Sequence, residues 1–175
     1  GSSQTVGELT LADNWNFEFE AAEDRFLTHW LKGDTNGIAD EPAVTHYTLG
    51  ACGEAGAPGN EWRTASDWPT HGHTVAYHLS ADGALTADAP TADARLEFTF
   101  DPADPCPTLG GANAHIKKGP YDQRALGSRA DILTFMTPPL AEAVEATGSV
   151  TVRLYASTDA PDTDFTAKLL DIYPD

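Results

Sequence analysis

Catalysis by a serine needs a hydroxyl that is exposed on a sharp turn and lies next to a base. The chain has seven serines, and none stands in the G-x-S-x-G pattern of a strand-to-helix turn that exposes a nucleophile. Ser128, in "LGSRAD", comes nearest, but it lacks the second glycine and a following helix. We therefore expect no catalytic residue in this chain.

Histidines and cysteines are the next candidates, because they bind transition metals. His71 and His73 form an "HGH" pair in a Pro/Gly-rich loop with no third ligand nearby in sequence, so a solvated pair is the simpler interpretation. Cys52 and Cys106 show no CxxC spacing. We expect two free thiols, with a disulfide between them as the open alternative. The sequence predicts no metal site and no cofactor.

Two acidic clusters raise the question of calcium, which takes about six to eight oxygen ligands from a bent loop. Neither cluster has the D-x-D-x-D-G pattern with a distal glutamate, and Asx turns and solvated loop ends account for both. Calcium binding stays an open alternative. The clusters lie at residues 34–41 and 159–164.

Trp62 and Trp68, in "EWRTASDWP", have the residue type of a sugar-stacking platform. They are equally typical of anchors in a core or an interface, because an indole ring buries a large apolar area. We favour the core or interface interpretation.

One helix is predicted at about residues 17–32, because Phe19, Ala22, Phe26 and Trp30 recur at steps of three and four residues. Gly33 is placed to cap this helix. Residues 34–41 then have the composition of a linker.

After the linker the apolar pattern changes to a period of two, which is typical of strands. In "SADG", Gly83 stands where a tight turn needs a positive φ. Many short strands with long loops predict a mainly β fold, an antiparallel β-sandwich or jelly roll preceded by one α-helix. The expected strands are residues 43–49, 73–79, 95–100, 131–135, 149–157 and 164–173.

The charge balance excludes two classes of partner. The 175 residues include 27 acidic and 10 basic side chains, for a net charge of −17. A field of this sign repels nucleic acid and anionic membrane surfaces. No apolar run approaches the roughly 20 residues of a membrane helix, and the first residues do not resemble a signal peptide. Localisation stays open, with the cytoplasm slightly favoured.

The order of several motifs resembles one family, the serine hydrolases that include cocaine esterase, α-amino-acid ester hydrolase and X-Pro dipeptidyl-peptidase. The resemblance covers nearly the whole chain, and its strength lies in seven motifs that follow in order. They are "FLTHWLKG", "PAVTHYTLG", "EWRTASDWP", "YHLSADGALT", "FTFDPADPCPTLGG", "YDQRALGSRADILTFMTPPL" and "GSVTVRLYASTDAPDTDFTAKLLDIYPD".

The resemblance implies a division of the chain. Residues 1–33 would be the tail of an α/β-hydrolase domain, and residues 42–175 a galactose-binding-like jelly roll that lacks its last strands. The family's Ser-His-Asp triad would lie outside this chain. The expected partners are then the catalytic and cap domains of the same polypeptide.

The proline-rich stretch "FDPADPCPTLGG" would be a preformed docking loop facing the catalytic domain, because proline fixes φ and paired glycines allow close backbone approach. The alternatives are a rigid surface loop or, for the whole chain, a free-standing carbohydrate-binding or structural interaction module. The candidate interface residues are Asp101, Pro105, Thr108, Gly110, Gly111, Trp62 and Trp68.

Overall fold

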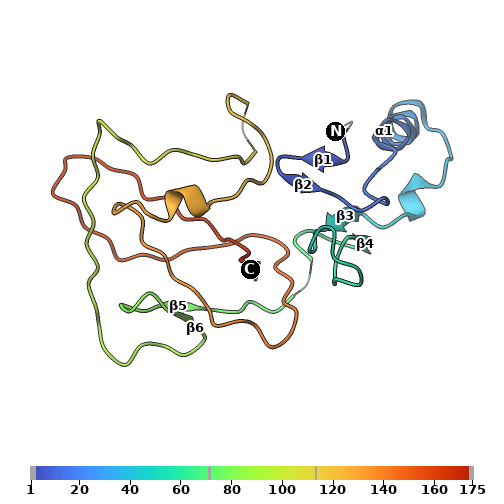
Figure 1. Cartoon of the computed structure of the whole chain (residues 1–175). Helices are drawn as coiled ribbons and strands as arrows, with labels where there is room; N and C mark the ends of the chain where they lie inside the picture. The colour runs from blue at the N-terminus through green and yellow to red at the C-terminus, as the bar shows by residue number, and fades with distance from the viewer. Residues whose placement is uncertain (1–2, 71, 113, 174–175) are drawn as a thin grey trace.

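The computed structural model describes residues 3–70, 72–112 and 114–173. Its helix α1 spans Phe19–Leu27 and continues through a π-helical turn, η1, at Thr28–Lys32 (Figure 1). Gly33 ends it in the left-handed region, with φ of 80°. The predicted helix and its glycine cap are therefore confirmed, with the start two residues later than expected.

The apolar stripe of this helix is open to solvent. Phe19 is 67% exposed, Trp30 65% and Leu31 77%. Phe26 and Trp30 contact each other, with ring centroids 6.3 Å apart. An apolar stripe of this kind normally faces a core. The exposed fractions show that the described residues leave this one uncovered.

The strands pair into three small antiparallel sheets of two strands each. Two short 3-10 helices, η2 at Ile38–Asp40 and η3 at Arg124–Leu126, lie in the connections. The three pairs are β1 (Thr5–Val6) with β2 (Leu9–Thr10), β3 (Val44–Thr48) with β4 (Glu61–Ala65), and β5 (His78–Leu79) with β6 (Leu85–Thr86).

The longest pair, β3–β4, presents two different faces. His46 lies opposite Arg63, and Tyr47 lies opposite Trp62. Because successive side chains of a strand point to opposite faces, the first pair lies on one side of this hairpin and the second on the other. The strand predicted at residues 43–49 is confirmed as β3, whereas β4 was not predicted.

The turn between β5 and β6 is the predicted one. Gly83 has φ of 83°, and its N–H donates to the carbonyl of Ser80 at 3.0 Å. Beyond it, the Leu85 N–H donates to the Met136 carbonyl at 2.8 Å, and the Met136 N–H donates to the Gly83 carbonyl at 2.9 Å. This hairpin therefore also holds the segment around residue 136.

Most of the longer strands predicted from the sequence are not paired in the structure. Residues 95–100, 131–135, 149–157 and 164–173 run extended without ladder pairing, and of residues 73–79 only His78–Leu79 pairs. Figure 1 shows the later half of the chain as long open loops. Alternating hydrophobicity reports that a segment prefers an extended form, but a sheet also needs a partner in register. The mainly β character is confirmed, and the described strands form small two-stranded sheets.

Packing in the described residues is correspondingly open. They contain no fully buried hydrophobic side chain. Val150 is 62% exposed and Leu154 46%. Phe98 and Phe165 meet edge-on with ring centroids 6.4 Å apart, which joins two of the extended segments. None of the helices among the described residues has the length and apolarity that a membrane crossing requires.

Candidate functional site

The Asp-Pro loop, residues 101–111, begins with a turn held by its own aspartate. The Asp101 carboxylate accepts the Ala103 N–H at 2.8 Å, and the Asp101 carbonyl accepts the Asp104 N–H at 3.1 Å. An aspartate that bonds the backbone two residues on is a common way to start a turn. Asp101 and Pro105 are both exposed, at the end of the loop remote from its glycines.

Arg129 fastens this loop to the segment that follows it. Its Nη2 donates to the Asp104 carbonyl at 2.6 Å, and its Nε and Nη2 donate to the two Asp131 carboxylate oxygens at 2.8 and 2.7 Å. A forked contact of this kind uses the planar guanidinium fully. Hydrogen bonding from Arg129 holds the pKa of Asp131 below its ordinary value, and the same bonds raise the pKa of Arg129.

The other end of the loop is built on glycine. Gly110 is buried with φ of 68°, and a Cβ there would strike the Gly119 carbonyl and lie 2.7 Å from Cδ2 of Tyr121. Gly111 and Gly119 bridge each other through N–H to carbonyl bonds of 2.7 and 3.1 Å. Only a residue without a side chain fits between these backbones.

The turn between β1 and β2 packs onto the same place. A Cβ on Gly119 would lie 2.7 Å from the Gly7 nitrogen and 2.9 Å from Cγ1 of Val6, and a Cβ on Gly7 would strike the Pro120 carbonyl. Gly7, Gly110 and Gly119 together form what we call the glycine interlock. It brings the N-terminal hairpin into backbone contact with Gly119 and Pro120, and Gly119 in turn bridges the end of the Asp-Pro loop.

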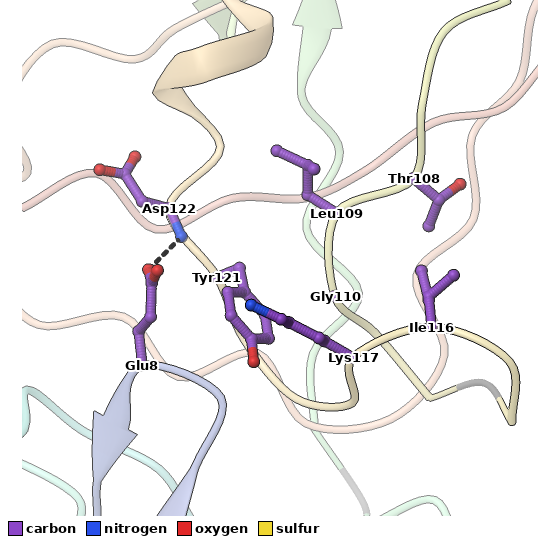
Figure 2. Close-up of a pocket in the computed structure, with 8 residues that line it drawn as sticks. All are labelled: Glu8, Thr108, Leu109, Gly110, Ile116, Lys117, Tyr121 and Asp122. Carbon is purple, nitrogen blue, oxygen red and sulfur yellow. Dashed lines mark hydrogen bonds between the residues drawn. The ribbon is translucent and has the colours of Figure 1, made fainter.

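Hydrogen bonds reinforce this contact. The Glu8 N–H donates to the Pro120 carbonyl at 2.9 Å, and the Asp122 N–H donates to Oε2 of Glu8 at 2.8 Å (Figure 2). Arg124 donates from its side chain to the Asp122 carboxylate at 2.8 Å, and this bond is the main reason that the pKa of Asp122 is lowered.

A cavity of about 350 Å³ opens between the hairpin turn and the loop. Figure 2 shows that the residues lining it come from three segments: the β1–β2 turn, the end of the Asp-Pro loop, and residues 116–122. The lining residues are Glu8, Thr108, Leu109, Gly110, Ile116, Lys117, Tyr121 and Asp122.

Trp62 belongs to a second junction of the N-terminal segment. Its indole N–H donates to the Asn14 carbonyl at 2.8 Å, and its ring lies 5.1 Å from Phe17 and 5.2 Å from Tyr47. The Tyr47 hydroxyl donates to Oδ1 of Asn14 at 3.0 Å. This face of β3–β4 is therefore covered by Asn14 and Phe17.

Trp68 lies against the opposite face of the same hairpin. It is 52% exposed and contacts His46 edge-on, with ring centroids 5.6 Å apart. On this face Arg63 pairs with Glu145, whose pKa is lowered chiefly by the Thr147 hydroxyl at 2.7 Å. The two tryptophans thus contact opposite faces and do not build one flat stacking platform.

The expected interface residues therefore separate into three groups. Thr108 and Gly110 line the cavity and Gly111 adjoins it; Asp101 and Pro105 lie at the far end of the loop. Trp62 and Trp68 flank the β3–β4 hairpin. The sequence-based interpretation did not name Glu8, Lys117, Tyr121 or Arg129. Gly111 and Gly119, which directly flank "ANAHIKK", were a sign that backbones approach each other there.

Cys52 and Cys106 are both free thiols, as the simpler expectation had it. Across the described ranges, no three His, Cys, Asp or Glu side chains are grouped to hold a metal ion. His71 of the "HGH" pair lies outside those ranges.

Comparison with known proteins gives one family match. The family described as X-Pro dipeptidyl-peptidase C-terminal non-catalytic domain matches residues 36–175. No solved structure is recognisably similar to the chain.

Named relatives add the kind of protein in which such a region occurs. "Cocaine esterase" of Rhodococcus sp. (strain MB1 Bresler) is 35% identical over 162 residues, which is 86% of this chain and 27% of that protein. "Putative serine esterase Mb1866c" of Mycobacterium bovis is 30% identical over 164 residues, which is 91% of this chain and 24% of that protein. The chain thus spans about a quarter of the length of the curated relatives it matches.

Proposed function

Because the chain belongs to the family of X-Pro dipeptidyl-peptidase C-terminal non-catalytic domains, we propose that residues 42–175 are the noncatalytic jelly-roll domain of a serine hydrolase. In this proposal the domain is galactose-binding-like, packs on the catalytic domain of the same polypeptide and helps to shape the active-site region. The parent enzyme acts on acyl esters or amides, or on X-Pro dipeptides.

The glycine interlock is the observation that carries this proposal. The family match begins at residue 36, so the β1–β2 hairpin precedes it in the chain. If residues 1–33 are the tail of the catalytic domain, the contact of Gly7 with Gly119 and Pro120 is a contact between domains. Backbones that approach without room for a Cβ fix the relative position of two segments closely.

The cavity supplies the part of the proposal that concerns the active site. It adjoins the hairpin on one side and the end of the Asp-Pro loop on the other. In the parent polypeptide this loop would face the catalytic and cap domains. Pro102, Pro105 and Pro107 reduce the conformational freedom that the loop loses when it is held in place.

The test uses the full-length parent polypeptide and a chromogenic ester. Thr108→Trp puts an indole into the cavity, and Thr91→Trp places the same group at an exposed position outside it. We expect Thr108→Trp to raise KM more for bulky acyl esters than for small ones, and Thr91→Trp to change neither. Pro105→Ala should lower the free energy of unfolding by about 0.4–1 kcal/mol.

Two results would overturn the proposal. If Thr108→Trp leaves kcat and KM of every ester unchanged, the cavity has no part in the active-site region. If Pro105→Ala also leaves stability unchanged, the loop is a surface feature without a docking role.

A further inference from the structure

Asn36–Gly37 is chemically unlike every other asparagine in the chain. The sequence has five asparagines, and only Asn36 precedes a glycine; the others precede Trp15, Phe17, Glu61 and Ala114. A glycine nitrogen approaches the side chain before it with little hindrance, because glycine has no Cβ. Asn36 is thus the asparagine whose carboxamide the following backbone nitrogen attacks most easily.

The carboxamide of Asn36 also ties the linker to the end of the helix. Its Nδ2 donates to the Arg25 carbonyl at 2.7 Å and to Oγ1 of Thr28 at 3.2 Å. Its Oδ1 accepts the Ile38 N–H at 3.3 Å. We call these three bonds the Asn36 clamp. Asn36 is half-buried, whereas Gly37 is exposed with φ of 78°.

We propose that Asn36 is a site of spontaneous deamidation, and that the product releases the linker from the helix end. The Gly37 nitrogen loses its proton to solvent and bonds to Cγ of Asn36. The Cγ–Nδ2 bond breaks, and ammonia leaves with a proton taken from water, which gives a succinimide ring. Water then opens the ring at either carbonyl, to aspartate or isoaspartate at position 36.

The product cannot remake the two bonds that the carboxamide donates to Arg25 and Thr28, because a carboxylate has no proton to donate. The group that donated to the Arg25 carbonyl becomes an acceptor facing an acceptor. The carbonyls at a helix C-terminus carry partial negative charge, which adds to the repulsion. The Arg25 guanidinium already forms an ion pair with Glu41, so a new carboxylate at position 36 would have to compete with Glu41 for it.

The clamp also sets the rate of the reaction. The leaving nitrogen is held by two acceptors, so the reaction proceeds when the helix end opens locally. A change that weakens the clamp without touching Asn36 should therefore speed the modification. Thr28→Val is such a change, because it removes one acceptor and keeps the side-chain shape.

The experiment ages the intact chain in mildly alkaline buffer and follows each asparagine by tandem mass spectrometry. We expect a gain of about one dalton confined to Asn36, resolved into two chromatographic isomers. The gain should be several-fold slower in Asn36→Gln, whose longer side chain disfavours ring closure, and faster in Thr28→Val. An unmodified Asn36, or equal modification at Asn14 and Asn60, would overturn the proposal.

A second measurement tests the consequence of the reaction. Asn36→Asp reproduces one product, and Thr35→Asp adds the same charge at an exposed neighbour outside the clamp. We expect Asn36→Asp to lower the melting temperature by about 2–4 °C and to speed amide hydrogen exchange in Thr28–Lys32. Equal effects of the two variants would show that charge alone matters and that the clamp does not.

Discussion

Removing the indole of Trp62 should separate the N-terminal segment from the β3–β4 hairpin. Trp62 contacts Phe17 and Tyr47 and donates to the Asn14 carbonyl at this junction. Trp62→Ala deletes both ring contacts and the donor, whereas Trp62→Phe keeps a ring and deletes only the N–H. The two variants therefore divide the junction into its apolar and polar parts.

The expected magnitude follows from these contacts. Each aromatic pair contributes about 0.5–1.5 kcal/mol, and a hydrogen bond of this kind contributes about 0.5–1.5 kcal/mol. Trp62 is half-buried, so truncating it does not leave the cavity that truncation of a fully buried side chain would. We therefore expect Trp62→Ala to lower the free energy of unfolding by about 2–4 kcal/mol. Trp62→Phe should lower it by about 1 kcal/mol.

The assay is urea unfolding of the chain followed by circular dichroism. With a slope of about 1–3 kcal/mol per molar, Trp62→Ala should move the midpoint by about 1 M or more. Trp68→Ala is the matched control, because Trp68 is 52% exposed and its ring contacts His46 on the opposite face of the hairpin. A double-mutant cycle with Phe17→Ala should give a coupling energy of about 0.5–1.5 kcal/mol.

Two outcomes would refute this reasoning. If Trp68→Ala destabilises the chain as much as Trp62→Ala, the junction at residues 14–17 contributes nothing particular. If the Phe17 and Trp62 effects simply add, the two rings do not stabilise each other.

Three further results are expected from the same urea assay. Arg129 depresses the pKa of Asp131, so the ion pair stabilises the fold at a pH above the ordinary aspartate pKa, and this stabilisation is lost as pH falls through the lower pKa of the folded state. Arg129→Met should therefore lower the free energy of unfolding at neutral pH and make it depend less on pH in that acid range. Gly110→Ala should destabilise by about 1–3 kcal/mol more than Gly53→Ala, whose positive φ is similar but whose Cβ would meet nothing within 4 Å. Glu145→Gln should have a smaller effect than Trp62→Ala, and added salt should reduce it, because the ion pair is partly exposed.

Local patterns were predicted well from sequence. The helix over Phe19–Lys32, its cap at Gly33 and the turn at Gly83 depend on residues a few positions apart, so their signals lie within one short window. β3 was found for the same reason. The β1–β2 hairpin was missed, because strands of two residues have no alternation to detect.

Contacts between segments that are distant in the chain could not be predicted from the sequence. The extended segments 95–100 and 149–157 have the alternation of strands, yet nothing in the pattern names their partner. The same limit applies to the site. Thr108 and Gly110 were identified from the loop itself, but Glu8 reaches Asp122 across 114 positions of the chain.

The proposed function requires that the glycine interlock joins two domains of one enzyme, and one comparison in the full-length parent tests this. Gly119→Ala and Gly53→Ala both place a methyl group at positive φ, but only at Gly119 does it meet Gly7 and Val6. We predict that Gly119→Ala lowers the free energy of unfolding by about 1–3 kcal/mol more than Gly53→Ala and also lowers kcat/KM for an ester. Equal stability and equal kcat/KM in the two variants would contradict the account.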